Sequence, residues 1–440
     1  MSLLLAIRKP VNPNDYLAPS RQVLWPQFAD RYPTGTWAWA ADAGAIWGGL
    51  YRTASTGGSL EFDNVVLNPG NYYVKVFCFK TTAYGVYTMY VDGVSTGLTF
   101  NFYSAGTDRN AVIEVPYTFS GASGKHTVSF VGANGAGGTA YSGFKQIEIV
   151  KATNYSGNNS NLLPAWNDIP PAMYSSSTAT PAFNISSTYQ WGTRMRVVNG
   201  GGTLTNYGVW FPGGDASLTV VQTLQSAGGI VSVKVDGVEV ATINSYDAGA
   251  IYSDFSTVSL GTVSPGMHTL TFEGKSAGTG GSCITYLQWL RVNYTTIDAP
   301  IGETFGNQSC MFYPWFEDSG EGKTAINTAA QSHYGYYYNN PASISDKFEF
   351  LQNLQAGTYQ LIHLGLQAGA GGIVSFDVDG GSDLGQVDLY SGSLTYNVLK
   401  TATLAGFTPG NLRAKTATKN TLSSNYINYC TYMRTVRTGD

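Results

Sequence analysis

Carboxylates are the first residues to consider for catalysis, and three of them form a local cluster. Glu317, Asp318 and Glu321 stand around Trp315 and Phe316. Two carboxylates beside aromatic rings could hydrolyse a glycosidic bond if they were held about 5 Å or about 6.5–9.5 Å apart. The simpler interpretation is a solvated loop, where charged side chains normally lie. We therefore expect no catalytic residue and no enzymatic activity.

The four histidines do not suggest a metal site. His126, His268, His333 and His363 are spread along the chain. His126 and His268 follow the same local motif in different units, so they cannot share a metal ion. We expect a strand histidine with a local hydrogen bond at each position, and neither a metal nor a cofactor.

Aromatic residues are stronger candidates for recognition. Rings that recur through the chain, such as Trp25, Trp166 and Trp315, indicate a shared packing role. Rings that do not recur are better candidates for contact with a glycan or another subunit, and we select Trp37, Trp39, Tyr207, Trp210, Tyr336, Tyr337 and Tyr338. A flat ring can stack on the C–H face of a sugar, and it suits a protein interface or a core equally well. Ligand contact, subunit interface and core therefore stay open for these seven.

The chain is organised around a short stretch of sequence that occurs three times. Asp92-Gly93, Asp236-Gly237 and Asp379-Gly380 each follow alternating apolar residues, at separations of 144 and 143 residues. An Asp-Gly pair in that setting predicts a tight β-hairpin, because both residues accept a positive φ. A constant period of this length indicates tandem copies of one domain.

The strand pattern predicts the fold class. Short β-branched and aromatic runs, such as 72–77 and 126–130, alternate with Gly, Pro and Asn turns. We expect an all-β chain of three tandem antiparallel jelly-roll β-sandwich domains, preceded by an extended N-terminal arm. The predicted boundaries are 1–20 for the arm, 21–152 for module 1, 153–296 for the linker and module 2, and 297–440 for module 3.

Composition excludes several classes of protein. Charged residues make up 12% of the 440 residues and the net charge is −4, so no basic footprint predicts nucleic acid. No stretch is long and apolar enough to span a membrane. The four cysteines are too few for a disulfide scaffold. We expect buried free thiols, with a Cys283–Cys310 bridge as the alternative.

The first twenty residues combine Pro10, Pro13 and Pro19 with an apolar start. Proline disfavours a helix here. We expect an arm whose Leu3, Leu4, Leu5 and Ile7 dock on a partner or on a neighbouring subunit; a frayed terminus is the alternative. The start does not have the pattern of a secretory signal, which favours assembly inside a host cell.

Module 2 shows a family resemblance most clearly. Ile230–Val238 forms a strand and an Asp-Gly turn, and a second strand then leads to Pro265-Gly266 and His268-Thr269-Leu270-Thr271-Phe272. This order resembles the jelly-roll carbohydrate-binding modules of the galactose-binding-like type, over about 60 residues of each module. The resemblance implies sugar binding by exposed aromatics with an Asn or Asp. Glu61 and Asp63 are the nearest counterpart of that family's calcium-binding carboxylate pair, and modules 2 and 3 have no acidic residues at those positions.

Together these features favour a bacteriophage virion protein, as a head decoration, fibre or tail adhesin. The expected partners are other virion proteins, a cell-surface polysaccharide and further copies of this chain. The location would be the virion, assembled in the host cytoplasm. A stand-alone carbohydrate-binding protein or lectin is the alternative, and a glycan hydrolase is a third hypothesis.

Overall fold

The computed structural model describes residues 21–42, 45, 49–53, 57–133, 141–151, 166–174, 176–178, 182–185, 193–199, 204–277, 283–294, 309–312, 319–320, 323–327, 336–339, 347–350, 357–408 and 412–439. Within these ranges the regular elements are β-strands and two short 3-10 helices, η2 (Pro26–Phe28) and η4 (Pro171–Met173). No helix in them is long and apolar enough to cross a membrane.

Module 1 is a sandwich of two antiparallel sheets. Its strands are β1 (Arg21–Leu24), β2 (Arg31–Thr34), β3 (Trp37–Ala41), β4 (Gly49–Thr53), β5 (Ser59–Leu67), β6 (Gly70–Lys80), β7 (Val86–Val91), β8 (Val94–Asn101), β9 (Asp108–Phe119), β10 (Gly124–Ala133) and β11 (Phe144–Lys151). One sheet has the order β3-β4-β11-β6-β9 with β1 on β11, and the other has the order β2-β5-β10-β7-β8.

Module 2 builds the same sandwich from one continuous sheet. Its strands are β12 (Trp166–Ile169), β13 (Ser176–Ser177), β14 (Ala182–Ile185), β15 (Thr193–Asn199), β16 (Leu204–Leu224), β17 (Gly229–Val235), β18 (Val238–Asn244), β19 (Ile251–Ala277) and β20 (Ile284–Tyr294). Strand β16 pairs with β19 almost throughout and continues through Gly213 and Gly214, whose φ values of 86° and 99° suit glycine. In module 1 the chain instead ends β5 at Leu67 and starts β6 at Gly70.

Module 3 repeats the two-sheet arrangement of module 1. Its strands are β21 (Ser309–Phe312), β22 (Ser319–Gly320), β23 (Lys323–Asn327), β24 (Tyr336–Asn339), β25 (Lys347–Phe350), β26 (Gly357–Gln367), β27 (Gly372–Val378), β28 (Gly385–Asp388), β29 (Thr395–Phe407), β30 (Leu412–Lys419) and β31 (Asn428–Gly439). The sheets have the orders β23-β24-β31-β26-β29 and β22-β25-β30-β27-β28. An all-β chain of antiparallel jelly-roll sandwiches, as predicted, is confirmed; residues 1–20, the expected arm, lie outside the described residues.

The three Asp-Gly pairs occupy equivalent turns. Asp92, Asp236 and Asp379 have φ values of 49°, 49° and 50°, and the glycines that follow them have 76°, 81° and 82°. Successive positive φ values are those of a type I′ hairpin turn. The first two turns join β7 to β8 and β17 to β18, as the alternating sequence predicted.

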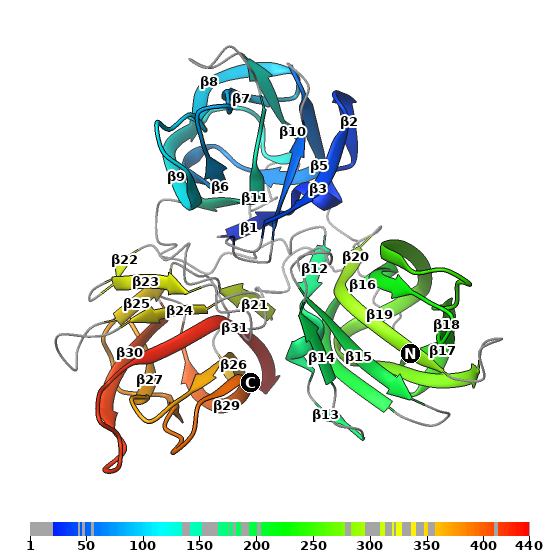
Figure 1. The fold of residues 1–440 in the computed structure, drawn as a ribbon, viewed down its shortest axis with the longest axis vertical. Helices are drawn as coiled ribbons and strands as arrows, with labels where there is room; N and C mark the ends of the chain where they lie inside the picture. The colour runs from blue at the N-terminus through cyan, green and yellow to red at the C-terminus, as the bar shows by residue number, and fades with distance from the viewer. Residues whose placement is uncertain are drawn as a thin grey trace, which may run out of the picture.

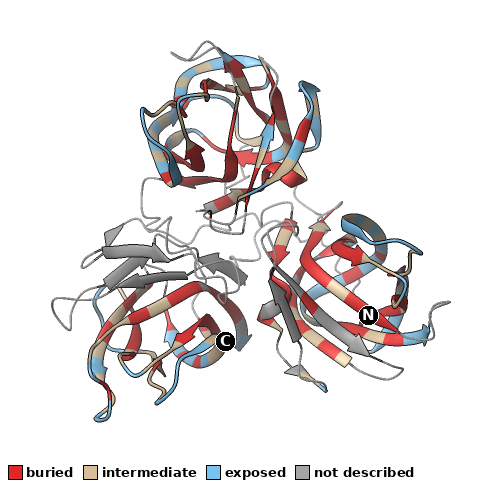
Figure 2. Cartoon of the chain, in the orientation of Figure 1, coloured by how far each residue is buried: buried red, intermediate tan, exposed pale blue. Residues whose placement is uncertain are grey.

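The three modules surround a common centre (Figure 1). Strands β1, β12 and β21 lie on the sides that face this centre, and they pair with β11, β20 and β31. The outer hairpins carry exposed residues, whereas the described residues of β11, β20 and β31 are largely buried (Figure 2). Trp289 of β20 and Arg434 of β31 take part in the contacts between modules.

Large side chains from different modules meet at this centre. Trp25 and Trp289 are fully buried, and their ring centroids lie 4.7 Å apart in an edge-to-face arrangement. The indole of Trp166 donates to the Val23 carbonyl at 3.3 Å. Arg434 of module 3 donates to the Gly208 carbonyl of module 2 at 2.8 Å. Burial lowers the pKa of Arg434 to about 10, against the opposing effect of Tyr294 and Tyr207.

Candidate functional site

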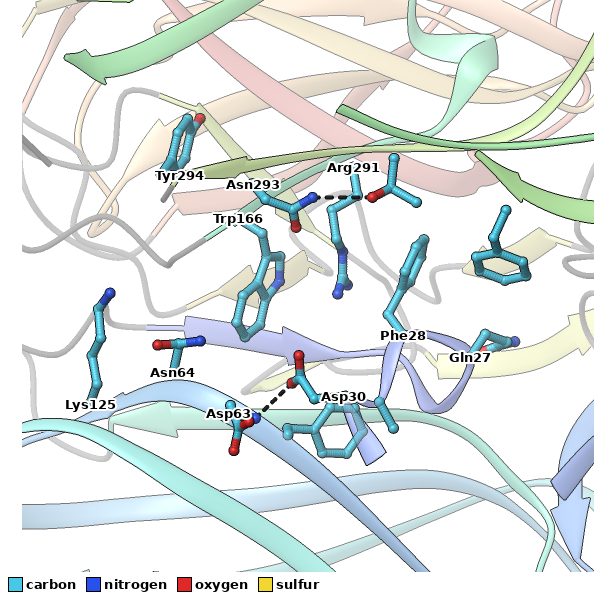
Figure 3. A pocket seen from close by; sticks show the side chains of 14 residues that line it. Gln27, Phe28, Asp30, Asp63, Asn64, Lys125, Trp166, Arg291, Asn293 and Tyr294 are labelled. Atoms are coloured by element: carbon cyan, nitrogen blue, oxygen red, sulfur yellow. Dashed lines mark hydrogen bonds between the residues drawn. The ribbon is translucent and has the colours of Figure 1, made fainter. Parts of the chain in front are cut away.

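A cleft of about 550 Å³ lies between modules 1 and 2. Module 1 contributes residues of η2 and of the segment that follows it, Asp63 and Asn64 from β5, and Lys125 from β10. Module 2 contributes Trp166 from β12 and residues of β16, β19 and β20 (Figure 3). The cleft exists only where the two modules are packed together, so no single module contains the whole site.

Arg291 forms the centre of the cleft. Its guanidinium carbon lies 3.8 Å from the centroid of the Phe28 ring and 5.0 Å from that of Trp166. Its Nε and Nη2 donate to the two carboxylate oxygens of Asp168 at 2.7 and 2.8 Å. The Trp289 indole donates to the same carboxylate at 3.1 Å. These contacts fix Arg291, a residue with 5% exposure, between two aromatic rings in the view of Figure 3.

The module 1 wall is acidic. Asp30 accepts a hydrogen bond from the Asp63 N–H at 2.7 Å. The pKa of Asp30 is raised, mainly by burial and also by the nearby Asp63 carboxylate. The hydrogen bond from the Asp63 N–H and the charges of Arg291 and Arg31 oppose this rise. Asn64 follows in the left-handed region, with φ of 60°. Asparagine tolerates that conformation better than most residues, so the sequence allows the bulge in β5, opposite β10, that presents this wall.

Asp63 is already bound on both oxygens. Arg31 donates to them from Nη1 and Nη2 at 2.7 and 2.9 Å, and the Thr127 hydroxyl donates at 2.8 Å. The Arg31 Nε donates to Glu61 at 2.9 Å. The carboxylate pair that the family resemblance offered as a calcium site therefore holds a guanidinium. In the described ranges no three His, Cys, Asp or Glu side chains gather as a metal site requires.

The module 2 wall combines amide, hydroxyl and aromatic groups. Asn293 donates to the Thr219 hydroxyl at 3.2 Å. Phe255 is 40% exposed and meets the Phe28 ring edge-to-face, with centroids 5.6 Å apart. Tyr294 also lines the cleft and is largely buried, and this burial raises its pKa. The wall thus offers hydrogen-bonding groups beside an accessible apolar ring.

The formal charges that line the cleft cancel. Asp30 and Asp63 are acidic, and Lys125 and Arg291 are basic. A cleft of this volume with aromatic surface and a few fixed polar groups is typical of a small-molecule site. A neutral ligand rich in hydroxyls fits this chemistry, because hydroxyls both donate and accept hydrogen bonds while C–H faces cover the rings.

The seven aromatics predicted from the sequence do not gather at this cleft. Trp37 packs in the core of module 1 and stacks on Tyr51, with centroids 6.0 Å apart. Tyr207 is fully buried in module 2 and donates to the Pro171 carbonyl at 2.9 Å. Of the three roles left open by the sequence (ligand contact, subunit interface and core), Trp37 and Tyr207 therefore have the core role. Trp39 is partly exposed on β3.

The other predicted residues have only a backbone position or none. Trp210 lies in β16, and Tyr336, Tyr337 and Tyr338 lie in β24, where the structure describes the strand alone. The arm residues Leu3, Leu4, Leu5 and Ile7 and the carboxylates Glu317, Asp318 and Glu321 fall outside the described residues.

The predicted equivalence of Trp25 and Trp166 is wrong. Trp166 begins β12 and pairs with Asn293, whereas Trp25 follows the last residue of β1. Pro26 and Pro171 are the equivalent residues, since each starts a 3-10 helix. The two indoles therefore have separate roles: Trp166 lines the cleft, and Trp25 meets Trp289 in the module interface.

Most cleft residues could not be predicted from the sequence. Phe28, Asp30, Arg291 and Asn293 are each ordinary in their own segment, and they become a site only when two modules pack. A usable signal was the position of Arg291 in the repeat. Glu148, Arg291 and Arg434 occupy corresponding places in β11, β20 and β31, and all three are buried. A charged residue repeated in a central strand indicates a packed outer sheet face.

The histidine and cysteine predictions are resolved for the described residues. His126 contacts Asp92 through Nδ1 at 2.6 Å, and His268 contacts Asp236 in the same way at 2.6 Å. These are the expected local bonds. Cys78, Cys283 and Cys430 are buried free thiols.

His363 departs from the prediction. Neither ring nitrogen has a hydrogen-bond partner in the described structure. Burial lowers the pKa of His363 to about 4, so it is a neutral core residue of module 3.

No protein-family model and no curated protein matches this chain. Among solved structures, the CBM36-1 domain of a multidomain xylanase from the hindgut metagenome of Trinervitermes trinervoides is 10% identical, with 30% of this chain and 98% of that chain covered and a TM-score of 0.25. A family 35 carbohydrate-binding module from Clostridium thermocellum is 19% identical over 29% and 98%, with a TM-score of 0.23. A Paenibacillus xanthan lyase is 14% identical over 96% of this chain and 38% of that one, with a TM-score of 0.28. Likenesses of this strength carry no conclusion about what this chain binds.

Proposed function

We propose that this chain is a non-enzymatic binding protein that holds a neutral saccharide in the cleft between modules 1 and 2. The observation that carries the proposal is the composition of the cleft. Phe28, Trp166 and Phe255 supply ring surface, and fixed amide, hydroxyl and carboxylate groups stand beside them with no net charge. A saccharide presents the matching combination of C–H faces and hydroxyls.

Binding accounts for the two carboxylates of the cleft better than hydrolysis does. Most glycosidases need a pair of free carboxylates, one as the acid and the other as base or nucleophile. Asp63 has both oxygens engaged by Arg31, and Asp30 accepts the Asp63 N–H. These bonds suit two acceptors held in place for recognition.

The test is a neutral-oligosaccharide array probed with the full chain, followed by titration calorimetry on the best ligand. Phe255→Ala removes the exposed ring of the cleft and should weaken binding about tenfold, which corresponds to about 1.4 kcal/mol. Tyr252→Ala is the matched control: Tyr252 is 48% exposed on the same strand and does not line the cleft. Equal affinity for the two variants, or the absence of any saccharide ligand, would contradict the proposal.

The setting that we propose is a bacteriophage virion, with residues 1–20 docking the chain on another virion protein and the chain assembling into a homo-oligomer. The support is the apolar start of the sequence and the low charge content of its three tandem modules. Mass spectrometry of purified particles tests this setting. Saccharide binding without any particle association would leave the alternative, a stand-alone lectin.

A further inference from the structure

Lys145 is a buried amine that faces a side-chain amide. It lies in β11 with 1% exposure, and its Nζ lies 2.6 Å from the Oδ1 of Asn110 in β9. Strand β6 separates β9 from β11 in the sheet, and the lysine crosses it above Phe77, with Nζ 4.7 Å from the ring centroid. The carbonyl carbon of Asn110 is one bond beyond the contacted oxygen.

The surroundings favour an uncharged amine. In the described part of the chain, no carboxylate forms an ion pair with Lys145. Burial lowers its pKa to about 7, against the opposing charges of Cys78, Asp42 and Asp108. A buried lysine with a lowered pKa is nucleophilic at neutral pH, because much of it carries a free electron pair.

We propose that Lys145 and Asn110 are a modification site, where the two side chains join in an intramolecular isopeptide bond. The Lys145 Nζ electron pair attacks Cγ of Asn110, and a C–N bond forms as the amide oxygen takes negative charge. The C–N bond to the asparagine nitrogen then breaks and the carbonyl re-forms. One proton moves from the lysine nitrogen to the leaving nitrogen, so that ammonia departs and no oxidant or reductant is needed.

The folded structure already holds the Lys145 amine against the Asn110 amide. Two groups that a folded sheet holds in contact react as if at very high concentration. The apolar ring below and the burial around the amine exclude the water that would compete. The product would tie β9 to β11 across β6 and close a covalent ring over residues 110–145.

Module 2 provides a natural comparison. By strand register, Gln288 and Ser253 stand where module 1 has Lys145 and Asn110. The Ser253 hydroxyl donates to the Gln288 Oε1 at 2.8 Å. The same contact is thus made there by a hydrogen bond between groups that cannot form an amide.

Intact-mass spectrometry of the full, folded chain tests the proposal. We expect a mass about 17 Da below that of the sequence, through loss of ammonia. Tryptic digestion should leave the bond after Lys145 uncut and yield one peptide pair, joined between Lys145 and Asn110. Lys145→Gln, which copies module 2, and Asn110→Ala should each restore the sequence mass.

A wild-type mass equal to that of the sequence would overturn the proposal whether or not the variants fold. So would a loss of ammonia that fragmentation places elsewhere, such as a succinimide at Asn134-Gly135 or Asn199-Gly200.

Discussion

At the residue scale, the Arg291–Asp168 pair makes the strongest energetic prediction. Both side chains are buried, at 5% and 7% exposure, and their contact is bidentate. Asp168→Asn leaves a buried guanidinium without its counter-charge, which should destabilise the chain by about 3–5 kcal/mol. Urea unfolding followed by tryptophan fluorescence measures this loss.

The exposed Arg31 pair is the matched control for that experiment. Arg31 also binds a carboxylate bidentately, but its side chain is 53% exposed. Arg31→Gln should therefore cost only about 0–1 kcal/mol. Similar losses for the two variants would mean that the Asp168 pair is not functioning as a buried pair.

The two histidine–aspartate contacts predict an acid-dependent stability. Burial would raise the pKa of Asp92 and Asp236, but hydrogen bonds from His126 and Thr127, and from Thr269 and His268, outweigh it and lower both below the ordinary 3.8. A lowered carboxyl pKa gives stability that is present above 3.8 and is lost as the pH falls through the folded-state value. Both carboxylates are more than half exposed, so each should contribute at most about 1 kcal/mol.

A pH series of unfolding experiments checks this dependence. The free-energy difference between the wild type and the Asp92→Asn/Asp236→Asn double variant should be largest near neutral pH and shrink below 3.8. Asp247→Asn is the control, because Asp247 accepts a bond from the Gly249 N–H instead of from a histidine. A difference that stays constant down to the lowest pH would show that these bonds do not favour the charged carboxylates.

At the element scale, the hairpin turns depend on glycine conformation. Gly93 has φ of 76°, and a Cβ there would meet nothing within 4 Å. Gly93→Ala should still cost about 1–2 kcal/mol, because an L-residue is strained in the left-handed region. Gly106 also has open space and has no positive φ, so Gly106→Ala should be close to neutral in the same thermal unfolding assay. A neutral Gly93→Ala would indicate that the turn relaxes into another type.

The central strands could be predicted from the sequence, and several edge strands could not. The predicted runs 72–77 and 126–130 lie within β6 and β10, where buried apolar residues recur along the strand. Strand β30 was missed because Ala414 and Thr416, small residues, fill its core side. Strand β8 was missed because most of its side chains are exposed. Periodicity identifies a strand only when large apolar residues carry the pattern.

At the scale of the whole molecule, the cleft depends on how the modules pack. The repeat in the sequence predicted three copies of one fold, and the charged residue repeated at Glu148, Arg291 and Arg434 indicated which sheet face is packed, but not which residues of another module it would meet. Asp168 and Arg291 are 123 residues apart, and Trp25 and Trp289 come from different modules. Nothing local in a sequence specifies such contacts, so the site could not be assembled from motifs. Its location at an interface also makes ligand binding sensitive to the packing of modules 1 and 2.

The Trp25–Trp289 contact offers the sharpest test of that dependence. Both side chains are fully buried, and their rings meet edge-to-face at 4.7 Å. Trp25→Ala and Trp289→Ala should each cost about 3–5 kcal/mol, with a coupling of about 0.5–1.5 kcal/mol in the double-mutant cycle. The single variants should also weaken saccharide binding, because loss of the interface moves Arg291 and Phe28 apart.

A cycle that pairs Trp25→Ala with Tyr359→Ala is the control: Tyr359 packs on Phe407 in the core of module 3, so the two losses should add to within about 0.5 kcal/mol. Additive losses in the tryptophan cycle would contradict the predicted contact energy. Unchanged saccharide binding in a variant that has lost its interface would contradict the dependence of the cleft on module packing.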